Sequence, residues 1–402
     1  MFRKIAAALI LAASPAAAQD FDVSTALAEN GLAATEARLA GAPQTDANTQ
    51  FALGAVRFLR GIEKTLQLRH RHNATFAAFG IPVLRLPIPP NPNADPFYPA
   101  LITDLFAAVA VDMEASRTAL GRVAADADVA LSIDIAGLWF DINQNGTKDR
   151  GEELLATVAA ALAQRPGEAG LDGAPESLVI RFDTADVAWL RAYTHLISGV
   201  AELVLAFDPT EVVAEVAASV EQMNALRGNG QMDRFSFLRS EEGLVDMIAM
   251  VYGAINRVPD AARTRAARGH LLAMVAENRE FWKAVALEAD NEREWIPNAT
   301  QRSALGFELP PETGTTWLGI LGDAEAVLKG DLLVGHWRVE PGAGVNVAKL
   351  LENPVAVDLV TWIHGLGLVE HMERGPLVNP DNLRRFERMF AGDALLFMVW
   401  LN

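Results

Sequence analysis

Apolar side chains recur every three or four residues over most of this 402-residue chain, the spacing that places them on one face of a helix. The pattern is clearest over residues 47–68, where Leu59, Ile62 and Leu66 continue one such face. The same spacing predicts further helices over residues 101–123, 184–207, 210–226, 241–255 and 259–287. The chain is therefore predicted to be a mainly α-helical globular protein.

Two short runs alternate apolar and polar residues instead, with the period of a β-strand. They cover residues 129–135 and 178–182, and 153–164 between them has helical spacing. Residues 129–183 are thus predicted to form a strand–loop–helix–strand unit whose two strands pair. Further along the chain, the same reasoning predicts a short strand over 332–339 and a buried helix over 355–363. Seven prolines within residues 81–99 predict an extended loop.

The loop inside this unit, residues 141–152, reads DINQNGTKDRGE and places oxygen-bearing groups at loop positions 1, 3, 5, 7, 9 and 12. In order, these positions hold Asp141, Asn143, Asn145, Thr147, Asp149 and Glu152. Gly146 at position 6 permits the sharp turn that brings the two halves together. Such spacing lets a short segment surround a hard cation with oxygen ligands. The alternative is an acidic surface turn that binds nothing.

These twelve residues resemble the calcium-binding loop of EF-hand proteins, and the rest of the chain has no such resemblance. The resemblance implies calcium (Ca2+) as ligand. It implies that Asp141, Asn143 and Asn145 coordinate through side-chain oxygens and Thr147 through its carbonyl. Asp149 would reach the ion directly or through water, and Glu152 would coordinate it with both carboxylate oxygens.

The flanks of the loop bear on the role of the ion. An EF-hand has a helix on both sides, whereas here a strand precedes the loop, as in the variant loops of exported bacterial proteins. Sensor EF-hands usually work in pairs, and this chain has one loop. We therefore expect a structural calcium ion rather than a switch. Only three of the ligands are carboxylates, which favours weak binding, with a Kd of roughly 10⁻⁴–10⁻³ M.

The amino terminus has the pattern of a signal peptide. Arg3 and Lys4 precede a short apolar stretch, and Ala16, Ala17 and Ala18 offer small residues for cleavage. The stretch is too short for the roughly 20 residues of a membrane span. The chain has no cysteine, which excludes disulfides and thiol chemistry. We expect a periplasmic or secreted protein without a stable membrane anchor. Its net charge of −17 disfavours nucleic acid and anionic membranes as partners.

A polar stripe is predicted on the helix at 184–207. Arg191, His195, Ser198 and Glu202 follow one another by four, three and four residues, so they share a face. A histidine beside a carboxylate could serve as a general base in a cavity. The alternatives are a solvated face and a buried structural network, which such stripes more often form.

Three other groups of residues have weaker signals. His70 and His72, or His364 and His371, lack the spacing of common zinc sites. Basic residues at 257–270 could hold an anion or form surface ion pairs. The sequence contains no G-x-S-x-G elbow, P-loop, dinucleotide-binding fingerprint or H-E-x-x-H motif.

The expected organisation is a signal peptide (1–18), a helical region (19–128), the calcium-loop unit (129–183) and a second helical region (184–402), with the three mature parts forming one or two domains. The expected function is that of an exported calcium-binding protein serving as a periplasmic binding or scaffold protein. The alternative is a periplasmic hydrolase that uses carboxylates or the Arg191, His195 and Glu202 stripe.

Overall fold

The computed structural model describes residues 21–43, 45–74, 86–157, 175–226, 241–289, 291, 293–306, 308–391 and 393–401. In these ranges the chain is mainly helical, with small antiparallel sheets, which confirms the predicted fold class. The expected signal peptide lies outside the described residues.

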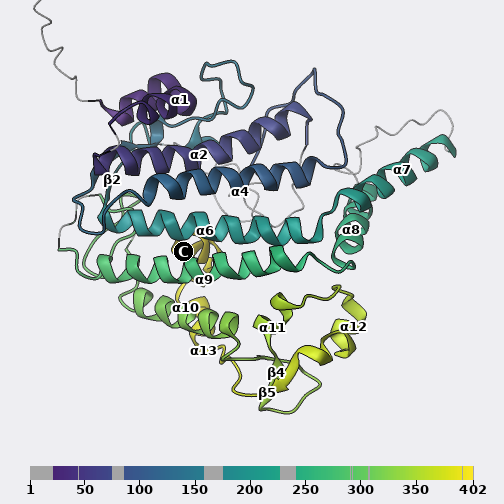
Figure 1. Ribbon diagram of the computed structural model, residues 1–402. Helices are drawn as coiled ribbons and strands as arrows, with labels where there is room; N and C mark the ends of the chain where they lie inside the picture. Colours follow the sequence, from purple (N-terminus) through teal and green to yellow (C-terminus); the bar gives the residue numbers. More distant parts are fainter. Residues whose placement is uncertain are drawn as a thin grey trace, which may run out of the picture.

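Four long helices lie side by side and form the body of the molecule (Figure 1). They are α2 (Ala47–Arg71), α4 (Leu101–Leu120), α6 (Thr184–Phe207) and α9 (Ala261–Val285). Helix α1 (Val23–Ala40) covers α2 on one outer side, and α10 (Thr313–Lys329) lies against α9 on the other. The body is therefore a stack of helices whose inner members, α4 and α6, are covered on both sides.

Aspartate residues cap α2, α6 and α9, and a glycine allows the close approach of α2 and α4. Asp46 caps α2 by accepting a hydrogen bond of 2.7 Å from the backbone N–H of Thr49. Gly54 of α2 faces α4 so closely that a Cβ atom there would lie 2.5 Å from Leu120. The Ser116 hydroxyl donates to the Gly54 carbonyl across this contact, at 2.7 Å. The close approach of α2 and α4 therefore depends on a residue without a side chain.

Helix α6 is long and apolar enough to cross a membrane by length and composition. In this structure it is the central helix, packed between α4 and α9, and core helices of soluble proteins pass the same test. Its N-terminus has a capping box. The Asp183 side chain accepts from the backbone N–H of Asp186, and the Asp186 side chain accepts from the backbone N–H of Asp183.

The remaining elements are shorter. Helices α7 (Thr210–Leu226) and α8 (Glu241–Ile255) project from one end of the body (Figure 1). The carboxyl-terminal part contains α11 (Val347–Glu352), α12 (Leu359–His364), η3 (Leu366–His371), α13 (Asp381–Met389) and α14 (Ala394–Leu401), with a sheet of β3 (Val334–Gly335), β4 (Ala343–Val345) and β5 (Met372–Arg374).

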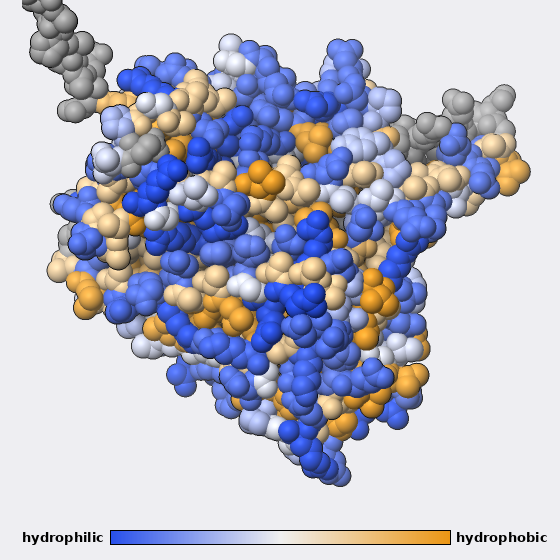
Figure 2. All heavy atoms as spheres, viewed as in Figure 1, coloured by the Kyte–Doolittle hydropathy of each residue, from blue (hydrophilic) through white to orange (hydrophobic). Residues whose placement is uncertain are grey.

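Two predictions for this part need correction. The strand expected over 332–339 is reduced to β3, because a turn follows at once. The helix expected to be buried over 355–363 is the short, exposed α12, in which Val360 is 74% exposed and Ile363 64%. Apolar residues also reach the surface on α8, and the viewed face carries several such patches among mostly hydrophilic residues (Figure 2). The described part of the proline-rich segment, residues 86–99, is irregular, as predicted.

Candidate metal-binding loop

A two-stranded sheet holds the unit that contains the loop. Strands β1 (Ala130–Asp134) and β2 (Val179–Asp183) pair antiparallel, as predicted, with Ile133 opposite Ile180. A 3-10 turn, η1 (Ile135–Gly137), separates β1 from the extended residues before the loop, so the loop does not follow the strand directly. Of the helix expected after the loop, residues 154–157 are helical and the rest lies outside the described residues.

Backbone hydrogen bonds close the base of the loop. The N–H of Phe140 donates to the carbonyl of Glu152 at 2.9 Å, and the N–H of Leu154 donates to the carbonyl of Leu138 at 2.9 Å. Phe140 and Ile142, on either side of loop position 1, are buried in the core under α2. The two ends of the loop are thus held together by the backbone before any ligand is considered.

The polar side chains predicted as ligands lie close to one another. The side-chain amides of Asn143 and Asn145 both donate to the same oxygen of Asp149, at 2.6 and 2.7 Å. The two carboxylate oxygens of Asp141 accept from the backbone N–H groups of Asn145 and Gly146, at 3.0 and 3.1 Å. Loop positions 3, 5 and 9 therefore meet at one Asp149 oxygen, and position 1 is bonded to the backbone of positions 5 and 6.

Glu152, at position 12, lies behind this group. One of its carboxylate oxygens accepts from the N–H of Ile142 at 2.9 Å, and the other accepts from the N–H of Asp149 at 2.9 Å. Its side chain spans the two halves of the loop and is almost completely buried, at 1% exposure. Burial raises the pKa of the Glu152 carboxyl, the three backbone donors oppose that effect, and the negative charge of Asp141 adds to it.

The donor set suits a hard cation. The predicted ligands are carboxylate, amide and backbone oxygens, the atoms that Ca2+ prefers, and none is a nitrogen or sulfur ligand. Gly146 has a φ of +74°, and nothing lies within 4 Å of the place where a Cβ would stand. The side-chain amides of Asn143 and Asn145 donate to the Asp149 carboxylate. A bound cation would replace these donors as the positive partner of that carboxylate.

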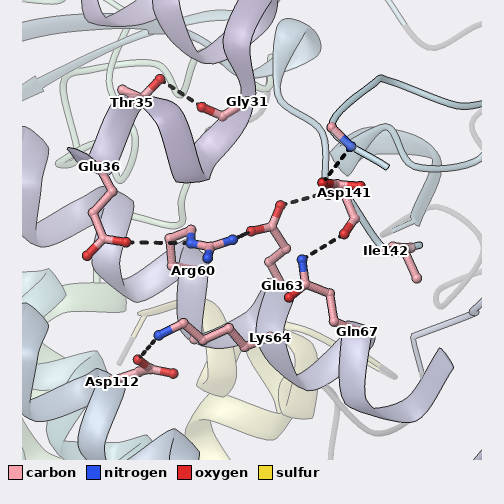
Figure 3. A network of polar contacts seen from close by, with 12 residues as sticks. Gly31, Thr35, Glu36, Arg60, Glu63, Lys64, Gln67, Asp112, Asp141 and Ile142 are labelled. Carbon is pink, nitrogen blue, oxygen red and sulfur yellow. Dashed lines mark hydrogen bonds and ion pairs between the residues drawn. The ribbon is translucent and has the colours of Figure 1, made fainter. Parts of the chain in front are cut away.

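Helix α2 contacts the first residue of the loop on both sides of its backbone (Figure 3). The carboxylate of Glu63 accepts from the N–H of Asp141 at 2.8 Å, and the side-chain amide of Gln67 donates to the carbonyl of Asp141 at 2.8 Å. Glu63 is 1% exposed and also pairs with Arg60, which contacts Glu36 of α1. These residues carried no signal in the sequence, because they lie more than 70 positions from the loop.

Helix α1 holds the segment before the loop. The indole N–H of Trp139 donates to the carbonyl of Ala28 at 3.1 Å, and its ring packs against Gly31. Gly31 has a φ of +73°, which interrupts α1, and a Cβ there would lie 2.9 Å from the Trp139 ring. The kink in α1 thus makes room for the residue two positions before the loop.

The polar stripe of α6 is divided among separate partners. Arg191 donates to the carbonyls of Leu120 and Val123, at 2.5 and 3.2 Å. Ser198 accepts from Arg117 of α4 at 2.8 Å. On the side of α9, Glu202 accepts from Arg263 at 3.0 Å, and His195 bonds to His270 at 2.9 Å. The structure therefore places the stripe in contacts between α6 and its neighbours α4 and α9.

The surroundings of His195 and His270 lower the pKa of both rings and so favour their neutral forms. Burial, together with the positive charges of Arg117 and His270, lowers the pKa of His195 to about 4. Burial and Arg117 also lower the pKa of His270, against the opposing effect of Glu202 and Glu114. The Nδ1 atoms of the two rings share one hydrogen bond, so one ring donates and the other accepts.

The weaker histidine candidates have backbone partners in the structure. The His72 ring bonds to the carbonyl of Pro96 at 2.8 Å, just beyond the end of α2. His371 is buried and its Nε2 lies 2.8 Å from the carbonyl of Asn353, whereas His364 is exposed. These contacts do not bring the members of either pair to a shared point.

The basic residues at 257–270 also find protein partners. Arg257 pairs with Glu211, Arg263 with Glu202, and Arg265 with Glu352. Arg268 donates to the carbonyl of Leu328 at 2.6 Å. The ordinary interpretation, ion pairs and helix contacts, accounts for this cluster.

A second group of carboxylates was missed by the sequence reasoning. Asp183, Glu288 and Glu294 offer oxygens that all lie within 4.8 Å of one another. Burial, and then the negative charge of Asp183, keeps the pKa of the neighbouring Asp186 carboxyl well above its ordinary value. Asp183 also caps α6, but its glutamate neighbours lie over 100 residues away and no local pattern links them.

Comparison of the chain with protein-family models, with curated proteins and with solved structures finds no match.

Proposed function

We propose that this chain is a calcium-binding protein in which the ion joins the two halves of loop 141–152 and fixes the loop to the helical body. The observation that carries the proposal is the hydrogen bonding inside the loop, where the amides of Asn143 and Asn145 meet at one Asp149 oxygen and Glu152 bonds to both halves of the loop. A bound Ca2+ would supply positive charge at that point, in place of the two amide groups that now donate to Asp149.

A structural role for the ion agrees with the surroundings of the loop. Its base is closed by backbone hydrogen bonds, and its first residue is bonded to α2 on both sides. Sensor EF-hands instead move a helix pair to open an apolar groove. A loop held at both ends can transmit little such motion, so the ion would stabilise this arrangement rather than change it.

The wider role we propose is that of an exported binding or scaffold protein. Support for export comes from the amino-terminal sequence and from the weak calcium affinity expected of a site with three carboxylates. The hydrolase alternative would need His195 to face a substrate as a general base. Its Nδ1 is bonded to His270, and Arg191 and Glu202 have their own partners.

Thermal melts of the chelator-stripped full chain test the calcium proposal. A ligand that binds only the folded state at ten times its Kd stabilises that state by about 1.4 kcal/mol. We expect this gain with millimolar Ca2+ and a much smaller gain with Mg2+, which prefers a smaller octahedral site. Equal melting temperatures with and without Ca2+ would contradict the proposal.

A further inference from the structure

Among the described residues, Asp141 is the predicted ligand whose backbone is bonded to a helix far away in the sequence. The N–H of Asp141 donates to Glu63 and its carbonyl accepts from Gln67, each at 2.8 Å. Glu63 and Gln67 are four residues apart on α2, so they present neighbouring side chains from one face of that helix (Figure 3).

These two contacts fix the peptide groups on both sides of the Asp141 Cα, and so the direction in which its side chain leaves the backbone. The Asp141 carboxylate then bonds to N–H groups inside the loop. Neither Glu63 nor Gln67 is among the predicted ligands. Groups that orient a ligand from outside commonly change metal affinity by 10- to 100-fold when they are replaced.

Glu63 is also buried and paired, which fixes the position of its carboxylate beside the loop. Its side chain is 1% exposed, and its second carboxylate oxygen is paired with Arg60. Burying a carboxylate costs free energy unless it is paired and hydrogen-bonded. The bonds of Glu63 to Arg60 and to the Asp141 N–H offset this cost. Its negative charge also lies one hydrogen bond away from the backbone of the first ligand.

We infer that Glu63 and Gln67 are positioning residues of the calcium loop, which set its affinity from helix α2 without touching the ion. This inference rests on the proposed calcium function. Because coupling between two events is reciprocal, calcium binding would in turn stabilise the contact of the loop with α2.

Calcium titrations of chelator-stripped full-length variants test this inference. Glu63→Gln keeps the shape and an acceptor for the Asp141 N–H but removes the charge and the pairing with Arg60. Gln67→Met keeps the length of the side chain but removes its donor. We expect each to raise the Kd for Ca2+ by roughly 10- to 100-fold.

Lys64→Gln is the matched control. Lys64 follows Glu63 on the same helix but pairs with Asp112 of α4, at 2.5 Å (Figure 3). In the described part of the chain it has no bond to the loop. Its Kd for Ca2+ should equal that of the wild type.

The outcomes separate the two proposals. If the wild type binds no Ca2+, the proposed function fails. If the wild type binds and both Glu63→Gln and Gln67→Met bind with the wild-type Kd, the positioning role is wrong. An equal loss in Lys64→Gln would also overturn it, because the effect would then be a general one on α2. Should Glu63→Gln not fold, Gln67→Met, whose side chain is only half-buried, decides alone.

Discussion

The loop at 141–152 and the polar stripe of α6 are both rich in polar side chains, but these side chains have different kinds of partner. In the loop, the side chains of Asn143 and Asn145 share a single Asp149 oxygen within one short segment. In the stripe, each side chain has its own partner on a neighbouring helix, such as His270 for His195. The first arrangement is typical of a site that a ligand completes, and the second is typical of a network that the protein completes by itself.

The largest effect that we expect is a loss of stability when a partner of the α6 stripe, Arg117, is replaced. Arg117 is 11% exposed and donates to the Thr194 carbonyl and the Ser198 hydroxyl, at 3.0 and 2.8 Å. Arg117→Met would leave both acceptors without this donor, so we expect a loss of about 2–3 kcal/mol in the free energy of unfolding. Urea melts with and without Ca2+ measure it.

The calcium dependence is the informative part of that experiment. The loss should be the same in both conditions, because the stripe does not contact the loop among the described residues. A loss that disappears when Ca2+ is present would show that the two regions are one coupled system, and the comparison would fail.

We expect a smaller effect of pH on the free energy of unfolding, through the histidine pair of His195 and His270. The folded-state pKa of His195, about 4, lies below the ordinary value of 6.5, so the unfolded chain binds more protons between these values. Stability contributed by a neutral His195 is therefore complete above pH 6.5 and is lost as the pH falls towards about 4. The loss is on the order of 1–2 kcal/mol once partial exposure of the ring is allowed for.

His195→Leu should flatten the stability curve over this window, whereas His364→Ala, at an exposed position, should leave its slope unchanged. Chemical denaturation at a series of pH values from 7 to 4 makes the comparison. Parallel curves for the wild type and His195→Leu would mean that the pair does not hold the ring neutral.

Local patterns predicted much of this structure. The helices α7 and α8 have the bounds that apolar spacing predicted, and β1 pairs with β2 as their alternation predicted. These features depend on residues within a few positions of one another. Helix α1 has no counterpart among the predictions, because its many alanines give little contrast between faces and Gly31 breaks its period.

The contacts around the candidate sites were beyond the reach of such patterns. The loop spacing predicted a set of ligands, but it did not predict Glu63 and Gln67, which reach Asp141 only because α2 packs over the unit. The α6 stripe was visible in the sequence, while its pairing with His270 and Arg117 depends on how α6 is rotated between α4 and α9. Sequence alone therefore could not decide between a cavity and a network.

Calorimetric titration of chelator-stripped protein with Ca2+ tests the central claim most directly, on the wild type, Glu152→Gln and Glu294→Gln. Glu152 is the buried carboxylate of the loop, and Glu294 belongs to the other close group of carboxylates. We expect one ion per chain with a Kd of roughly 10⁻⁴–10⁻³ M. Binding should be lost in Glu152→Gln and unchanged in Glu294→Gln. Wild-type protein that binds no Ca2+ at millimolar concentration, or a Glu152→Gln variant that binds as well as the wild type, would contradict it.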